Sequence, residues 1–163
     1  MKKKYFLIVF PSLAILFLDQ ITKWGILRIL DIHQSITVIP GFFNLVHVRN
    51  RGMAFGFLNR AGSDLPFYFL LFATLGAIFF LVFWALKLKP EEYRILPGLS
   101  LILGGAMGNL IDRIRLHEVI DFLDFQIGHF HWPAFNVADS AITVGTLWVA
   151  FNLLFRHSPR PRE

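Results

Sequence analysis

Two carboxylates of this chain lie in surroundings that carry almost no charge. Asp139 directly precedes the apolar residues 140–155, and Asp121 lies earlier, in the apolar segment VIDFLDF. An ionisable residue beside hydrocarbon is costly and is by default a candidate functional group. Two carboxylates held close together cannot both ionise cheaply and tend to share one proton. The ionised partner can then take a proton from water while the protonated partner polarises a carbonyl, which is how aspartic proteases divide the work.

Both positions also allow other interpretations. Asp139 comes just before a predicted helix, so its carboxylate could serve only as a helix cap. Asp124 is the alternative to Asp121, because both lie in one segment with the composition of a strand. Residues three apart in a strand point to opposite faces, and their spacing alone does not decide between them.

The composition indicates a membrane protein. Of the 163 residues, 55 % are hydrophobic and only 17 % are charged, against about 25 % charged in soluble domains. There is no cysteine, which excludes disulfides and thiolate sites, and the six histidines lack the spacing of a zinc enzyme. The net charge of +5 comes from basic residues at the ends of apolar blocks, so we expect a membrane surface and not nucleic acid as their partner.

Four apolar blocks are long enough to cross a bilayer, which takes about 20 residues. We expect helices over residues 5–27, 65–88, 94–113 and 137–156. The first block resembles a secretory signal, but it lacks a small-residue cleavage site and continues with helical periodicity, so we expect it to be retained. Asp19 and Lys23 lie four residues apart near its end and can pair as a structural polar pair.

The positions of the basic residues predict the orientation. Three short segments carry clusters of Lys and Arg, at residues 2–4, 87–94 and 156–162, and four spans place all three on the same side. By the positive-inside rule this side is the cytoplasm, with both termini there and residues 157–163 as a cytoplasmic tail. The long connections over residues 28–64 and 114–136 then lie outside. Their β-branched and aromatic residues, broken at glycine and proline, predict a small β-rich cradle.

With the spans placed, polar residues from separate segments reach one depth near the outer end of the bundle. The residues concerned are Asp19, Lys23, Asn50, Asn109, Asp112, Arg113, Asp121, Asn136 and Asp139. Simpler roles exist for several of them, such as an ion pair between Asp112 and Arg113 that ends a helix. Gly104 and Gly108 have the spacing that lets membrane helices approach closely. The convergence as a whole favours a functional site.

Four motifs in this order resemble those of the lipoprotein signal peptidase (signal peptidase II) family. They are DQITK, RNRGMAFGF, GGAMGNLIDR followed by VIDF, and PAFNVADSAI. Each motif alone is weak, but together they cover nearly the whole chain. The resemblance implies an integral membrane, mainly α protein with four transmembrane helices and an outer β-cradle. It also implies an aspartic endopeptidase of the bacterial inner membrane.

By this resemblance the catalytic dyad falls on Asp121 and Asp139, and not on Asp124. The family's other motif positions match residues expected to bind substrate or support the dyad: Asn50, Gly52, Asn109, Asp112, Arg113 and Asn136, besides the pair Asp19 and Lys23. Asp112 is expected to fix Arg113. One departure from the family is Met53-Ala54, where paired alanines are common.

The resemblance further implies the substrate and the reaction. The enzyme would cleave prolipoproteins before a cysteine that carries a diacylglyceryl group, with water as the nucleophile and with no metal or organic cofactor. We expect a monomer among membrane lipids. A proton-relaying transporter is disfavoured by the absence of an inverted repeat. A scaffold would keep partner binding when Asp121 or Asp139 is changed to Asn.

Overall fold

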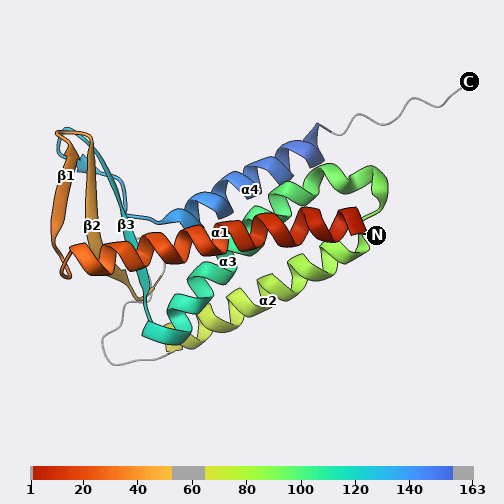
Figure 1. Cartoon of the computed structure of the whole chain (residues 1–163), viewed down its shortest axis with the longest axis horizontal. Coiled ribbons are helices and arrows are strands. Elements are labelled where there is room, and N and C mark those ends of the chain that lie inside the picture. The colour runs from red at the N-terminus through yellow and green to blue at the C-terminus, as the bar shows by residue number, and fades with distance from the viewer. Residues whose placement is uncertain (1, 53–64, 156–163) are drawn as a thin grey trace, which may run out of the picture.

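The computed structural model describes residues 2–52 and 65–155. Four long helices run side by side, a small sheet closes one end of the bundle, and the start of the first helix and the end of the last lie at the other end (Figure 1). Met53, Ala54 and the predicted tail 157–163 lie outside the described residues.

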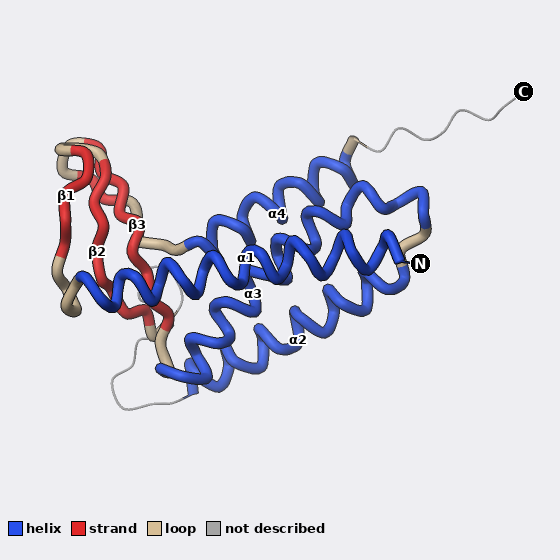
Figure 2. The backbone as a smooth tube through the Cα atoms, viewed as in Figure 1, coloured by secondary structure: helices blue, strands red, loops and turns tan. Residues whose placement is uncertain are grey.

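The helices agree with the predicted fold class. They are α1 Lys2–Ile29, α2 Leu65–Lys87, α3 Leu96–Leu116 and α4 Val137–Leu154, and a short 3-10 helix, η2 Pro90–Ile95, leads into α3. All four long helices are apolar and long enough to cross a membrane. The prediction of a mainly helical membrane protein with a small sheet is therefore confirmed (Figure 2).

The helix ends differ from those expected from hydropathy alone. We expected α1 to begin at residue 5, but it begins at Lys2, and the buried Lys4 Nζ donates to the carbonyl oxygens of Leu86 at 2.7 Å and Leu88 at 3.0 Å. A charged residue can therefore lie within the helix, because its ammonium caps the end of α2. At the other end of the molecule α3 continues past residue 113 to Leu116, where His117 adopts φ 60° and ends it.

Helix α3 is the centre of the bundle, since it packs against the other three and is mostly buried. Glycines allow this close packing. A Cβ atom on Gly104 would lie 2.6 Å from the backbone oxygen of Ser12 in α1, and one on Gly105 would collide with the backbone oxygen of Ala138 in α4. The small residues of α3 thus bring both neighbouring helices close to it.

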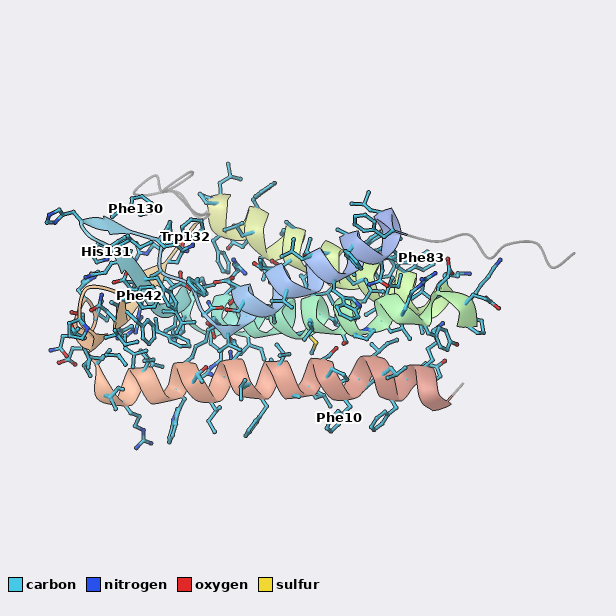
Figure 3. The ribbon with its side chains drawn as sticks, turned by 90° about the horizontal axis from the view of Figure 1, so that it is seen from above. Phe10, Phe42, Phe83, Phe130, His131 and Trp132 are labelled. Carbon is cyan, nitrogen blue, oxygen red and sulfur yellow. The ribbon has the colours of Figure 1, made fainter. Side chains whose placement is uncertain are left out.

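The other helices expose large apolar side chains on their outer faces. Phe10 on α1 points away from the bundle (Figure 3) and is 62 % exposed, and Phe83 on α2 is 51 % exposed. Water would disfavour so much exposed aromatic surface, whereas lipid tails solvate it. The bundle is therefore shaped for hydrocarbon on its outside.

The sheet has four antiparallel strands in the order β1-β2-β3-β4. The strands are β1 Ser35–Ile39, β2 Phe43–Asn50, β3 Val119–Ile127 and β4 Phe130–His131. Ile120 and Phe122 of β3 pack on Ile26 and Leu30 at the end of α1. This contact attaches the sheet to the bundle and brings the start of β3 against the helix ends.

The close packing of α1 on α3 gives a direct prediction. Gly104→Val should lower the thermal unfolding temperature in detergent, because its side chain must push against the backbone of α1; overpacking of this kind costs about 1–3 kcal/mol. Gly76→Val is the matched control, since nothing lies within 4 Å of a Cβ atom at Gly76 in α2. Equal unfolding temperatures for the two variants would contradict this account of the bundle.

Candidate active site

The structure brings Asp121 of β3 close to Asp139 in the first turn of α4, with Asn136 linking them. Asn136 Nδ2 donates to Asp121 Oδ1 at 2.8 Å, and the Asp139 backbone N–H donates to Asn136 Oδ1 at 2.9 Å. Asn136 is fully buried, so water does not compete for these bonds. One side chain therefore fixes the start of α4 relative to the Asp121 carboxylate.

Capping explains only part of what Asp139 does. Asn136 is the N-cap of α4, and Asp139 completes a capping box by accepting from the Asn136 backbone N–H through Oδ2 at 3.3 Å. The other oxygen, Oδ1, accepts from Asn109 Nδ2 of α3 at 2.8 Å. A helix cap needs no such partner from another helix, so the simple capping interpretation is incomplete.

Asn50 supports Asp121 from β2. Its Nδ2 donates to Asp121 Oδ2 at 3.1 Å, while its Oδ1 accepts from the backbone N–H of Gly52 at 3.0 Å. The second bond leaves the Asn50 amide only one orientation, with its NH₂ group toward Asp121. The two oxygens of the Asp121 carboxylate thus each accept from an asparagine.

Behind the two aspartates lies a buried group of charges. Lys23 Nζ lies 2.8 Å from Asp19 Oδ2, 2.7 Å from Asp112 Oδ2 and 2.9 Å from Asn109 Oδ1. All four side chains are at most 5 % exposed. A charge this deep in the bundle is stable only when it is paired and hydrogen-bonded, and here each oxygen around the ammonium is an acceptor.

The expected contact between Asp112 and Arg113 is absent. Asp112 binds Lys23 instead, and it also accepts from Gln20 Nε2 at 3.0 Å and from the Ile120 backbone N–H at 3.3 Å. The physical reason is helical geometry, because neighbouring residues on a helix do not face one another. The expectation that Asp112 fixes Arg113 was therefore wrong.

Arg113 lies near three carboxylates of the site. Its guanidinium is close enough to interact electrostatically with Asp139, Asp112 and Asp121, and its Nη1 donates to the backbone oxygen of Asn109 at 3.4 Å. No ion pair within 4.0 Å involves Arg113 among residues 2–52 and 65–155. Its remaining N–H groups can therefore be offered to a ligand beside the carboxylates.

Burial raises the pKa of Asp121. Removal of its carboxyl group from water, together with the nearby negative charge of Asp139, raises the pKa of Asp121 from 3.8 to about 7. The hydrogen bonds from Asn50 and Asn136 oppose this rise and do not cancel it. At neutral pH Asp121 can thus hold a proton beside a second carboxylate.

Asp124, the alternative to Asp121, points to the other face of the sheet. There it accepts from Asn44 Nδ2 at 2.9 Å, and His131 Nδ1 lies 3.0 Å from each of its carboxylate oxygens. Thr37 Oγ1 donates to Asn44 Oδ1 at 3.0 Å, so a line of polar side chains crosses all four strands. Asp124 thus ties the strands together and lies away from Asp139.

One polar residue of this region was not predicted. Gln20 Nε2 donates to Asp112 Oδ1 at 3.0 Å and to Asp19 Oδ2 and the Gly108 backbone oxygen at 3.2 Å each. The signal was available, since Gln20 lies beside Asp19 in an apolar helix. A neutral amide is less costly in a membrane helix than a charge, so its presence there is a weaker sign of a functional site.

Comparisons with known proteins agree on one family. The family described as "Signal peptidase (SPase) II" matches residues 12–155. A lipoprotein signal peptidase of Syntrophus aciditrophicus is 46 % identical over 156 residues, which is 94 % of this chain and 96 % of the relative. Another, from Maridesulfovibrio salexigens, is 52 % identical over 145 residues, covering 87 % and 91 %.

The fold has a solved counterpart as well. A structure described as a bacterial membrane enzyme, solved at 2.3 Å, matches with a TM-score of 0.82 and 33 % identity, covering 95 % of this chain and 92 % of that one. Sequence and fold thus lead to the same conclusion over almost the full length. The chain belongs to the signal peptidase II family.

Proposed function

We propose that this protein is an aspartic endopeptidase that removes signal peptides from prolipoproteins. Its family supports peptidase action on these substrates. The observation that carries the aspartic mechanism is the pair of carboxylates that both accept from Asn136, Asp121 from its side chain and Asp139 from its backbone N–H, with the pKa of Asp121 raised to about 7. In this proposal Asp121 is the protonated partner and Asp139 the ionised one.

The environments of the two carboxylates support this division of roles. Asp121 is 3 % exposed, whereas Asp139 is partly exposed and lies in the first turn of α4, where the helix dipole favours negative charge. Both oxygens of Asp139 accept from N–H donors, on Asn109 and on the Asn136 backbone. These two bonds fix the orientation of the Asp139 carboxylate.

The proposed reaction follows from these protonation states. Asp139 takes a proton from a water molecule as the oxygen of this water attacks the scissile carbonyl carbon, and Asp121 gives its proton to the carbonyl oxygen. The resulting gem-diol collapses when the C–N bond breaks. The leaving nitrogen then takes the proton from Asp139, and one hydroxyl of the gem-diol returns a proton to Asp121.

The remaining residues of the site have supporting roles in this proposal. Arg113 lies near both carboxylates and forms no ion pair with any residue that the structure describes, so it would bind a substrate carbonyl. Asn50, held by Gly52, would orient Asp121. Lys23 and Asp19 would hold the helices in register around the site.

The location of the site accounts for a lipid-bearing substrate. Asp121 belongs to β3 and Asp139 to the first turn of α4, and these two segments lie where the sheet meets the apolar bundle, at the end opposite the start of α1 (Figure 1). By the positive-inside rule, the clusters of Lys and Arg at residues 2–4, 87–94 and 156–162 support a cytoplasmic location for both termini and a site at the outer face of the bacterial inner membrane. We infer that the scissile bond precedes a diacylglyceryl-modified cysteine, whose acyl chains remain in the bilayer.

The central test is cleavage of a purified prolipoprotein, with and without its diacylglyceryl group, by the full-length enzyme in lipid. Asp121→Asn and Asp139→Asn should each lower cleavage by about 10²- to 10⁴-fold, the usual contribution of a positioned acid or base. Asp124→Asn is the matched control on the opposite face of β3 and should keep most of the activity. Full activity of either dyad variant would remove that residue from the mechanism, and equal cleavage of unlipidated substrate would refute the lipid requirement.

The acidity of Asp121 predicts the pH dependence of the rate. Because the reaction needs Asp121 protonated, kcat/KM should fall as the pH rises through about 7, the value to which burial raises the pKa of this group. Ordinary aspartates with a pKa near 3.8 would give no such fall. Rates measured from pH 4 to 9 on lipidated substrate would show it, and a rate that keeps rising above pH 8 would contradict the assignment.

A further inference from the structure

We propose that Lys23 is a positioning residue that holds Asn109 in a single orientation, with its NH₂ group toward the Asp139 carboxylate. The inference rests on the proposed function and adds a residue to it that touches neither substrate nor dyad. Lys23 was expected to form a structural pair with Asp19. Lys23 also donates to Asn109 Oδ1 at 2.9 Å. This third contact fixes the orientation of a neighbouring amide, which an ion pair with Asp19 alone would not do.

The orientation of Asn109 follows from the chemistry of an ammonium group. Lysine has three N–H donors and no acceptor, so a side-chain amide beside it must present its oxygen. Asn109 therefore turns its NH₂ group the other way, where Nδ2 lies 2.8 Å from Asp139 Oδ1. Asn136 Nδ2 reinforces this orientation, with a longer contact of 3.3 Å to Asn109 Oδ1. An asparagine free to rotate could instead present its oxygen to Asp139, and the hydrogen bond to the carboxylate would be lost.

The ammonium is itself anchored to both segments that carry the dyad. Asp19, which binds Lys23 through Oδ2, accepts from the Ala138 backbone N–H through Oδ1 at 2.9 Å. Asp112 Oδ2 binds Lys23 and also accepts from the Ile120 backbone N–H. Ala138 and Ile120 are the chain neighbours of Asp139 and Asp121. Lys23 is therefore fixed relative to both catalytic segments.

Charge alone does not explain the arrangement. Lys23 is surrounded by two carboxylates, so Asp19, Lys23 and Asp112 together carry a net charge of −1 if all are ionised. Within the described part of the chain, Arg113 from α3 and Asp121 from β3 also interact electrostatically with Asp139. A cluster without net positive charge is a poor source of attraction for Asp139, whereas a fixed hydrogen-bond donor acts directly on it.

The experiment is the pH profile of kcat/KM for a charge-matched variant, Lys23→Met/Asp112→Asn, on lipidated substrate. This variant keeps Asp19 and hence the net charge of the cluster, but it removes the donor that orients Asn109. The acid limb of the profile should move up by about one pH unit, as expected for the loss of one hydrogen bond to a carboxylate of the site. Asp112→Asn alone keeps Lys23 against Asn109 and should leave this limb without an upward shift.

A second comparison tests whether Lys23 acts through Asn109. Asn109→Ala should raise the acid limb by a similar amount, and adding it to Lys23→Met/Asp112→Asn should produce no further shift, because both changes remove the same interaction. Additive shifts would overturn the proposal. Thermal unfolding of each variant in detergent verifies that it is folded. Should the Met variant fail to fold, Lys23→Gln/Asp112→Asn replaces it, since glutamine can still donate to Asp19 but does not force one orientation on Asn109.

The outcomes separate this inference from the proposed function. A wild-type profile with two limbs, lost activity in Asp121→Asn and Asp139→Asn, and an acid limb that stays in place without Lys23 would overturn only the role of Lys23. A uniform loss of rate at every pH would have the same meaning, because it indicates a purely structural residue. A wild-type enzyme whose rate does not depend on either aspartate would instead refute the proposed function.

Discussion

The rest of this structure depends on the pairing of charges that cannot reach water. Asp19, Lys23 and Asp112 lie inside an apolar bundle, where an unpaired charge would cost several kcal/mol. Their partners come from α1 and α3 and from backbone N–H groups at the start of α4 and in β3. Because these three charges need all of these partners, they hold α1, α3, α4 and β3 at fixed distances from one another. The polar cluster therefore works as a joint between the bundle and the sheet.

Because buried polar groups need partners, the candidate site lies at the ends of secondary-structure elements. Asp139 lies in the first turn of α4, Asp121 near the beginning of β3 and Asn50 at the end of β2. At such ends the backbone has N–H groups without partners within the helix, and buried side chains can use them. Asn136 uses this property to connect a helix start with a carboxylate on a strand. Glycines in α3 let α1 and α4 come close enough for this network to form.

Much of the architecture was predictable, because long apolar blocks have few alternatives in a membrane protein. The proximity of Asp19 and Lys23 followed from a spacing of four residues on one helix, and the opposite faces of Asp121 and Asp124 followed from strand alternation. The amide network was not predictable, since the contacts of Asn109, Asn136 and Gln20 depend on how separate helices approach. The interaction of Asp112 with Arg113 was predicted wrongly because adjacency in sequence was taken for adjacency in space.

The line of polar side chains across the sheet limits which changes of chain length this protein can accept. Asp121 and Asp124 are anchored on opposite faces of β3, so an insertion or deletion between them would turn one of them to the wrong side. The turn around Gly128 can accept a change of length. Leu123 and Phe135 pair at the base of this hairpin, and their pairing holds Asn136 in place. Relatives should therefore vary in length between β3 and α4 and keep β3 itself unchanged.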